Sequence, residues 1–166
     1  MSVIPQCNPV LGGLEKEWLL RCIDSGFVSS VGPMISEFEQ RFAAFTGARY
    51  AVATASGTTA LHAALHALNI RAGDAVGVAD LTFVASVNPV LYCGAEPVLI
   101  DVDPDTWCMD MRVLQSVCKQ RLKEGRPIKA VIPVHLYGNA CDLLALDALA
   151  AEYGFMIVED ATEALG

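Results

Sequence analysis

The stretch AVGVADLTFVASVNPVLYCGAEPVLID, residues 75–101, decides the fold class. It opens with a short apolar run, Ala75–Ala79, passes through a helical stretch, Phe83–Cys93, and ends in a second apolar run, Pro97–Asp101. Two short apolar strands joined by a helix are typical of a βαβ unit, in which the strands are parallel and the crossover is right-handed. The segment therefore predicts a buried parallel sheet. Because a proline interrupts a helix, Pro89 predicts a kink or a late helix start near Asn88.

The same alternation of strand and helix continues on both sides of this segment. Further β-rich runs are predicted at Tyr50–Ala53, Ala130–Val134 and Phe155–Val158, and further helices at Thr58–Leu68, Asp110–Glu124 and Asp142–Tyr153. Two helices precede them, one at Leu14–Asp24 and one that begins at Pro33 and ends at Gly47. We expect one α/β domain over residues 1–166, with a mostly parallel sheet and flanking helices and without an internal repeat or linker.

The composition fits a sheet that is covered on both faces. Of the 166 residues, 54% are hydrophobic and 18% are charged, against about 25% charged in a typical soluble domain. Parallel strands buried on both faces account for part of this excess, and a surface meant for a partner or a further segment accounts for the rest. The net charge of −8 argues against nucleic acid as a partner, because no basic stripe is present to neutralise phosphates.

The spacing of the cysteines and of the polar residues indicates the cellular compartment and whether a metal site or a membrane span is present. The six cysteines form no CxxC pair, and the N-terminus has no signal peptide pattern, so we expect reduced thiols and a cytoplasmic protein. The uncharged stretch Ala51–Ile70 contains too many polar residues for a membrane span and divides better into a strand, a turn and a helix. His62 and His66 lie four residues apart, but no third ligand accompanies them, so we expect no metal site.

Groups that could carry chemistry follow the strands, because the carboxyl ends of parallel strands meet at one edge of the sheet. Ser56-Gly57-Thr58-Thr59 opens an apolar helix, and the free N–H groups and hydroxyls of such a turn can hold a phosphate. An ordinary Ser/Thr helix cap is the alternative interpretation.

The later strands deliver an aromatic ring and two carboxylates to the same edge. Phe83 could stack on a flat ring, although an aromatic residue at a helix start is more often part of a core. Asp160 follows the last strand, and Glu163 comes three residues later, where helix capping is an equally good interpretation. His135 and Tyr137 follow the fourth strand, and a local hydrogen bond is the more common role for each.

A phosphate cradle, a stacking aromatic and an aspartate at a strand end together fit pyridoxal 5′-phosphate (PLP). The motifs SGTTALHAAL, AGDAVGVADLTFVASVNPVLYCGAEPVLIDVDPDTW, IKAVIPVHLYGNACD and FMIVEDATEALG, in that order, resemble the DegT/DnrJ/StrS-type sugar aminotransferases. The resemblance implies the large domain of a fold-type I PLP enzyme that transfers an amino group to a nucleotide-linked keto sugar. SGFVSSVGPMISEFE together with PVHLYGNACD resembles most the branch that aminates the 4-keto position of UDP-linked N-acetylamino sugars.

The resemblance also implies roles for individual residues. Gly57, Thr58 and Thr59 would hold the phosphate, Phe83 would stack on the pyridine ring, Asp160 would bind the ring N–H, and Glu163 would lie near the ring hydroxyl, where relatives commonly carry Gln or His. His135 and Tyr137 would contact the substrate. The implied partners are a nucleotide sugar, an amino donor such as glutamate, and a second subunit in a homodimer, with no membrane partner.

The resemblance places two parts of the family's fold beyond Gly166. These are the loop that carries the Schiff-base lysine and the C-terminal small domain. None of Lys16, Lys119, Lys123 and Lys129 lies at the expected edge of the sheet, so we expect the chain to be the N-terminal part of an enzyme and not to be competent alone. The alternatives are a non-catalytic module that binds PLP or a nucleotide sugar, a dehydratase of the same family, and an unrelated doubly wound nucleotide-binding domain, which would lack the usual Gly-rich fingerprints.

Overall fold

The computed structural model describes residue 4 and residues 8–165. Two residues used in the sequence analysis lie outside the described residues: Cys7, one of the six cysteines, and Gly166, the last residue of the given sequence. The chain divides into two compact units, Met1–Ala53 and Thr54–Gly166, and each unit is described by itself.

The first unit contains the helices α1 (Leu14–Ser25) and α2 (Pro33–Thr46). Both were predicted, and both end where the sequence requires a left-handed residue. Gly26 follows α1 with a φ of 75° and Gly47 follows α2 with a φ of 72°, a conformation that glycine adopts without steric cost. Pro33 opens α2, where its fixed φ suits the first helical turn.

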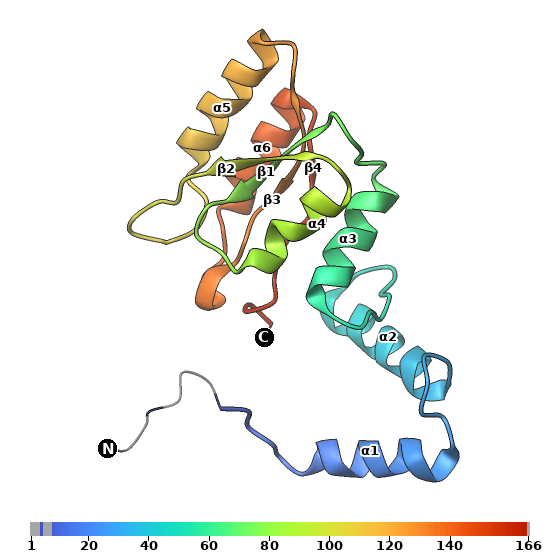
Figure 1. Cartoon of the computed structure of the whole chain (residues 1–166). Coiled ribbons are helices and arrows are strands. Elements are labelled where there is room, and N and C mark those ends of the chain that lie inside the picture. Colours follow the sequence, from blue (N-terminus) through green and yellow to red (C-terminus); the bar gives the residue numbers. More distant parts are fainter. Residues whose placement is uncertain (1–3, 5–7, 166) are drawn as a thin grey trace. The chain divides into compact units, whose positions relative to one another are not determined.

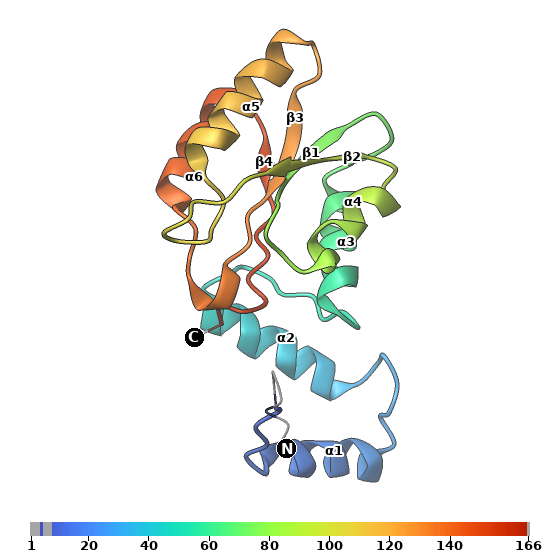
Figure 2. The same cartoon turned by 60° about the vertical axis from the view of Figure 1, so that its left-hand side comes forward.

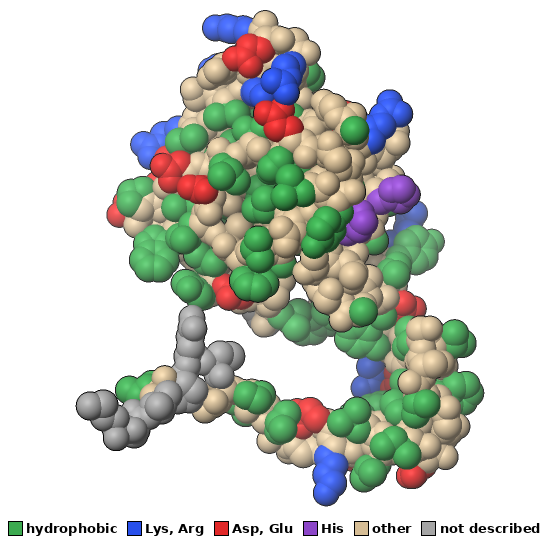
Figure 3. All heavy atoms as spheres, in the orientation of Figure 1, with side chains coloured by type: hydrophobic (Ala, Val, Ile, Leu, Met, Phe, Trp, Pro, Cys, Tyr) green, Lys and Arg blue, Asp and Glu red, His purple; other side chains and the backbone are tan. Residues whose placement is uncertain are grey.

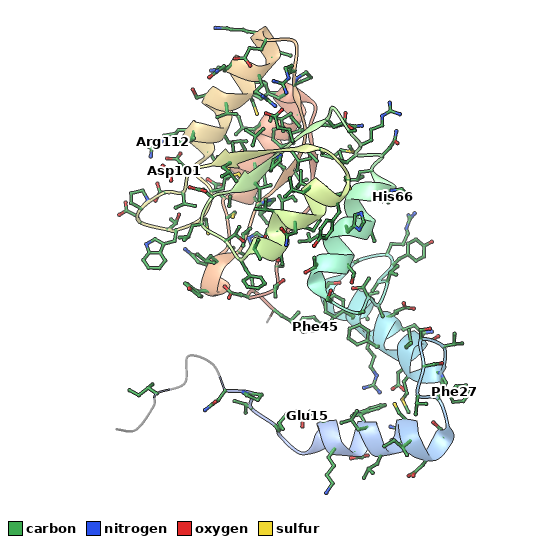
Figure 4. All side chains as sticks on the ribbon, in the orientation of Figure 1. Glu15, Phe27, Phe45, His66, Asp101 and Arg112 are labelled. Carbon is green, nitrogen blue, oxygen red and sulfur yellow. The ribbon has the colours of Figure 1, made fainter. Side chains whose placement is uncertain are left out.

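Neither helix of the first unit contains a buried residue. Figure 3 shows hydrophobic side chains on the surface of these helices, and Figure 4 labels two of the exposed aromatics, Phe27 and Phe45. Single exposed apolar side chains are normal, but two helices without any buried residue have no core of their own. The first unit therefore presents apolar surface that nothing in the unit covers.

The strand predicted at Tyr50–Ala53 is wrong. The segment is extended, with exposed side chains at Tyr50 and Val52, but it pairs with no strand of the described residues. The backbone N–H of Ala53 instead donates to Oε1 of Glu39, at 2.8 Å. A strand is defined by its partner, and a short apolar run alone does not supply one.

The second unit is built on a four-stranded sheet with the order β2-β1-β3-β4 (Figure 1). The strands are β1 (Ala75–Ala79), β2 (Glu96–Ile100), β3 (Ile128–Ile132) and β4 (Met156–Ile157). All three strand pairs are parallel, and Val78 of β1 lies opposite Leu99 of β2 and Ile132 of β3. The predicted parallel sheet is confirmed.

Helices cover both faces of this sheet, as Figures 1 and 2 show. On one face, α5 (Met111–Lys123) and α6 (Leu143–Tyr153) pack over a core that includes Leu114 and Leu146. On the other face, α3 (Gly57–Ala67) and α4 (Asn88–Tyr92) pack over a core that includes Leu65 and Val90. Every residue of β1 is buried, which is what a central strand between two helical layers requires.

The predicted helix Phe83–Cys93 divides into two short pieces. A 3₁₀ turn, η1 (Val84–Ser86), precedes α4, which begins at Asn88 with Pro89 in its first turn. The predicted late start near Asn88 is confirmed. The division has a consequence for the site, because η1 turns Ser86 inward until it is fully buried.

The histidine pair of α3 lies on an ordinary helix surface. The His62 ring packs edge-on against Tyr92 of α4, with 5.5 Å between the ring centroids, and His66 is exposed (Figure 4). Over residue 4 and residues 8–165, no helix is both long enough and apolar enough to span a bilayer.

Candidate active site

A cavity of about 350 Å³ lies at the carboxyl edge of the sheet. Five of the six residues predicted to bind a cofactor line it: Gly57, Thr58, Phe83, Asp160 and Glu163. These residues come from the start of α3, the loop after β1 and the segment after β4, and they are up to about a hundred positions apart in the chain. The convergence of strand ends that the sequence predicted is therefore present.

The start of α3 offers two backbone donors to this cavity. Ser56 and Thr59 form a reciprocal capping box, in which Oγ of Ser56 accepts from Thr59 N (3.3 Å) and Oγ1 of Thr59 accepts from Ser56 N (3.1 Å). No acceptor among the described residues bonds the backbone N–H of Gly57 or Thr58. Thr59 itself does not line the cavity, since its hydroxyl serves the cap.

Because residue 57 is a glycine, no side chain projects from this part of the cavity wall. A Cβ at this position would lie 3.6 Å from Oγ1 of Thr162, which also lines the cavity. Gly57 and Thr58, whose backbone N–H groups have no acceptor among the described residues, both line the cavity. Free N–H groups at a helix N-terminus, together with the helix dipole, favour an anion.

The Asp160 carboxylate is buried and is held in a fixed orientation. Its Oδ2 accepts from Oγ of Ser86 at 2.7 Å, and its Oδ1 accepts from Oγ1 of Thr162 at 2.7 Å and from Thr162 N at 3.3 Å. Its backbone continues the β3–β4 pairing, because Asp160 N donates to Pro133 O and His135 N donates to Asp160 O. Donors to both oxygens restrict the rotation of the carboxylate.

Sequence reasoning missed the hydroxyl groups of three residues in this arrangement, Thr82, Ser86 and Thr162. Ser86 is fully buried, and its Oγ lies 2.7 Å from Oγ1 of Thr82, a residue of the cavity wall. The sequence placed both residues at the start of an apolar helix, where a hydroxyl is no signal of a site. A serine within an otherwise apolar segment that also contains a helix-breaking proline was the available clue.

Phe83 is an exposed aromatic residue that lines the cavity. It lies four residues after the end of β1, is the N-cap of η1, and is 77% exposed although it lies in an apolar segment. A core aromatic would be buried, so the exposure favours a surface that a ligand can cover. Phe83 lines the cavity, as does Asp160.

Glu163 lines the cavity but also supports the loop after β3. Its Oε2 accepts from the backbone N of Tyr137 at 2.7 Å. Tyr137 belongs to the turn η2 (Leu136–Gly138), has a left-handed φ of 53°, and is 73% exposed. The carboxylate therefore holds a strained turn beside the cavity, and the Tyr137 side chain does not line the cavity wall.

His135 lies just outside the cavity lining. Its ring is buried, its Nδ1 accepts from Cys141 N at 3.1 Å, and its Nε2 lies 2.9 Å from Oε2 of Glu159. Both ring nitrogens are therefore engaged within the protein. The substrate-binding role given to His135 and Tyr137 stays a prediction.

No lysine of the described residues lines the cavity. Lys129 is the second residue of β3 and so lies at the amino ends of the strands, opposite the cavity. Its Nζ donates there to Asn69 O (2.6 Å) and to Oδ2 of Asp74 (2.8 Å). Lys119 and Lys123 lie on α5, across the sheet from α3. The cavity thus contains an anion-binding helix start, an exposed aromatic ring and an oriented carboxylate, which together suit a phosphorylated aromatic cofactor.

Comparison with known proteins identifies the class to which this fold and this cavity belong. An aminotransferase from Psychrobacter cryohalolentis superposes with a TM-score of 0.87 at 34% identity, over 95% of this chain and 39% of that one. A sugar aminotransferase from Streptococcus pneumoniae, Spr1654, solved in its PLP form, superposes with a TM-score of 0.84 at 28% identity, over 98% of this chain and 44% of that one. The chain therefore has part of the fold of the large domain of PLP-dependent aminotransferases.

The sequence comparison is more specific. Residues 10–166 match the DegT/DnrJ/EryC1/StrS aminotransferase family, and the chain belongs to this family. The GDP-perosamine synthase of Caulobacter vibrioides is 44% identical over 169 aligned residues, which cover all of this chain and 44% of that protein. The chain thus spans less than half the length of this relative. The family resemblance predicted from the motifs is confirmed.

Proposed function

We propose that this chain forms the N-terminal part of a PLP-dependent aminotransferase that acts on a nucleotide-linked keto sugar. The observation that carries the proposal is the cavity in which the oriented Asp160 carboxylate faces the same space as the free N–H groups of Gly57 and Thr58. Membership of the aminotransferase family supports the proposal, as does the sugar named for the Caulobacter relative.

The residues of the cavity fit PLP group by group. The backbone N–H groups of Gly57 and Thr58 would hold the phosphate, and the Phe83 ring would cover one face of the pyridine. Asp160 would accept a hydrogen bond from the protonated pyridine nitrogen, because hydroxyl donors already orient its carboxylate toward the cavity. When bound, PLP serves as an electron sink for amino-group transfer, and a protonated ring nitrogen strengthens that sink.

The other cavity residues would orient the cofactor. Glu163 would stand near the ring hydroxyl, and its hydrogen bond from Tyr137 N would hold the carboxylate in place. Thr59 would act through the capping box, which keeps the helix start in the conformation that binds phosphate. We place the lysine that binds PLP covalently, and the small domain, in the part of the complete enzyme that lies beyond this chain.

The identity of the sugar nucleotide has two candidates. The motif resemblance favours a UDP-linked 4-keto sugar, and the 44% identical relative is a GDP-perosamine synthase. The partners of the complete enzyme would be this nucleotide sugar, an amino donor such as glutamate, and a second copy in a cytoplasmic homodimer. An amine-transfer assay of the complete enzyme with UDP-linked and GDP-linked keto sugars separates the candidates.

The cofactor proposal is tested on the 166-residue chain by absorbance titration with PLP, followed by borohydride reduction. We expect weak, reversible binding and no stoichiometric adduct, because no lysine of the described residues lines the cavity. A stoichiometric reduced adduct on one lysine would contradict the assignment of the lysine to a later segment. No binding of PLP by the complete enzyme would overturn the proposed function itself.

A second candidate has one observation in its favour. The residues that line the cavity could hold an anion and an aromatic ring, and no lysine of the described residues is among them. A non-catalytic module that holds PLP or a nucleotide sugar needs no more than this, whereas a dehydratase of the same family would have histidine in place of the lysine. The coding sequence beyond Gly166 decides between them, since a lysine in the corresponding loop would support the aminotransferase.

A further inference from the structure

The hydroxyl groups of Thr82 and Ser86 form a short chain that ends on Asp160. Ser86 Oγ donates to Oδ2 of Asp160 at 2.7 Å, and Thr82 Oγ1 lies 2.7 Å from Ser86 Oγ. Ser86 is fully buried, Asp160 is 9% exposed, and the two residues are 74 positions apart. A buried serine hydroxyl must satisfy its hydrogen bonds inside the protein, and this one does so only through these two partners among the described residues.

The direction of each hydrogen bond in this chain follows from the charge at its end. An ionised carboxylate can only accept, so the single hydroxyl proton of Ser86 points to Asp160. Ser86 Oγ is then left as an acceptor, and the Thr82 hydroxyl must donate to it. Thr82 Oγ1 consequently offers lone pairs, and no proton, to the cavity that it lines.

We propose that Ser86 is a positioning residue for Asp160. Thr82, which lines the cavity, donates to Ser86 Oγ and thereby keeps the Ser86 proton directed at Asp160. The inference rests on the proposed function, in which Asp160 bonds the pyridine nitrogen. Thr162 fixes one carboxylate oxygen from the neighbouring segment, and Ser86 fixes the other from a different part of the sheet edge. With both oxygens held, the carboxylate keeps one orientation toward the cavity.

Removing Ser86 frees one carboxylate oxygen and leaves the Thr82 hydroxyl without its acceptor. The Ser86→Ala variant of the complete enzyme should therefore hold the ring proton less firmly, while the phosphate contacts at Gly57 and Thr58 are untouched. We expect kcat to fall about 10- to 100-fold, the usual range for loss of a supporting hydrogen-bond partner, with KM little changed. Thr82→Val should produce a smaller fall of the same kind.

The decisive readout is the ¹⁵N chemical shift of the ring nitrogen in enzyme loaded with ¹⁵N-labelled PLP. We expect Ser86→Ala to move this shift toward the value of the unprotonated ring. Ser86→Cys, which is slightly larger than serine but keeps a weak donor, should lie between. Ser116→Ala, which removes an exposed hydroxyl from α5 on the other face of the sheet, is the matched control and should leave the shift unchanged.

A double-mutant cycle separates positioning from a general structural role. In the Asp160→Asn background, Ser86→Ala should have no further effect on the ring shift or on kcat, because Ser86 acts through the carboxylate. An equal further loss in that background, or an unchanged ring shift in Ser86→Ala, would overturn the inference. Should Ser86→Ala fail to fold, Ser86→Cys and Thr82→Val carry the same test.

The two proposals fail in different ways. If the unmodified complete enzyme binds no PLP, or binds it with an unprotonated ring, the proposed function is wrong. If the unmodified enzyme holds a protonated ring and Ser86→Ala holds it equally well, the proposed function stands and the positioning role of Ser86 is wrong.

Discussion

Gly57 and Thr162 meet at the wall of the cavity: a Cβ on Gly57 would lie 3.6 Å from Oγ1 of Thr162. This is an ordinary van der Waals separation, so one methyl group fits without displacing the threonine. A larger side chain at position 57 would reach further into the cavity that Gly57 and Thr162 both line. The short distance between Gly57 and Thr162 therefore limits the volume that is left for an anion.

Gly57→Val should weaken binding of PLP and leave the fold intact. The additional methyl groups would occupy the space where the phosphate meets the helix start, so we expect a loss of at least about 1 kcal/mol in PLP binding, comparable to one hydrogen bond. Binding of pyridoxal, which has no phosphate, should change less. Titration of the complete enzyme with both compounds measures the difference. Gly57→Ala is the control, and a loss as large as that of Gly57→Val would contradict the steric argument.

Asp160→Asn should abolish most transamination while preserving the shape of the cavity. The amide cannot carry the charge that stabilises a protonated ring nitrogen, so we expect turnover of the complete enzyme to fall by several orders of magnitude. PLP affinity should fall only modestly, because the phosphate and ring contacts remain. Turnover and PLP titration check the two expectations separately. Turnover near that of the unmodified enzyme would show that Asp160 is not the partner of the ring nitrogen.

The Lys129–Asp74 ion pair predicts a stability difference that depends on pH. The side-chain hydrogen bond from Lys129 holds the pKa of Asp74 below its ordinary value of 3.8. A carboxylate with a lowered folded-state pKa stabilises the fold above its unfolded pKa and loses that contribution as the pH falls through the folded value. Lys129→Met should therefore cost up to about 1 kcal/mol at neutral pH, since the pair is partly exposed, and progressively less below about pH 4.

Thermal unfolding across this pH range measures the effect. Lys119→Met removes an exposed lysine of α5 for which the described residues supply no ion-pair partner, so it is the control. A Lys129→Met difference that is independent of pH would show that the lost bond to Asn69 O, and not the ion pair, accounts for the change.

The buried thiols should not react while the protein is folded. Burial raises the pKa of Cys118 to about 11 and that of Cys141 to about 12, and the nearby Glu152 and Cys108 add to the respective effects. Because the thiolate is the reactive species, neither cysteine should be alkylated at neutral pH. Iodoacetamide labelling with mass spectrometry should detect Cys22, which is partly exposed, before either of them. Labelling in urea is the control, in which all three should react.

The 166-residue chain by itself should form oligomers or aggregate, and should have no aminotransferase activity. Helices α1 and α2 bury no residue, and β4 pairs on one side only within the described sheet. Uncovered apolar surface and an open sheet edge both favour association with another chain. Light scattering and an amine-transfer assay check these expectations. Addition of the C-terminal half of a complete enzyme as a separate chain should improve solubility, and a stable monomer would contradict the argument.

Much of the sheet could be predicted because its strands are short apolar runs with polar ends. Ala75–Ala79 was predicted to the residue, since Asp74 and Asp80 bound it on both sides. Tyr50–Ala53 has a similar pattern but is no strand, because pairing depends on a neighbouring segment that no local pattern can supply.

The residues of the site likewise divide into those that could be predicted from the sequence and those that could not. Gly57, Thr58 and Asp160 were predictable, because each follows a strand or opens a helix at the edge where ligands bind. Ser86 was not, since only the break between η1 and α4 turns its hydroxyl inward. His135 has the right position in the chain, but its ring is committed to Cys141 N and Glu159, and a sequence does not reveal which way a side chain turns.

The capping box of α3 has a thermodynamic consequence for any anion that binds there. Ser56 and Thr59 hold the first helical turn through their own hydrogen bonds, so that turn is formed before a ligand arrives. An incoming phosphate then loses little of its contact energy to the ordering of a loop, because the conformational entropy has already been given up during folding. Affinity at this end of the cavity is in this sense determined during folding, by two side chains that need not touch the ligand.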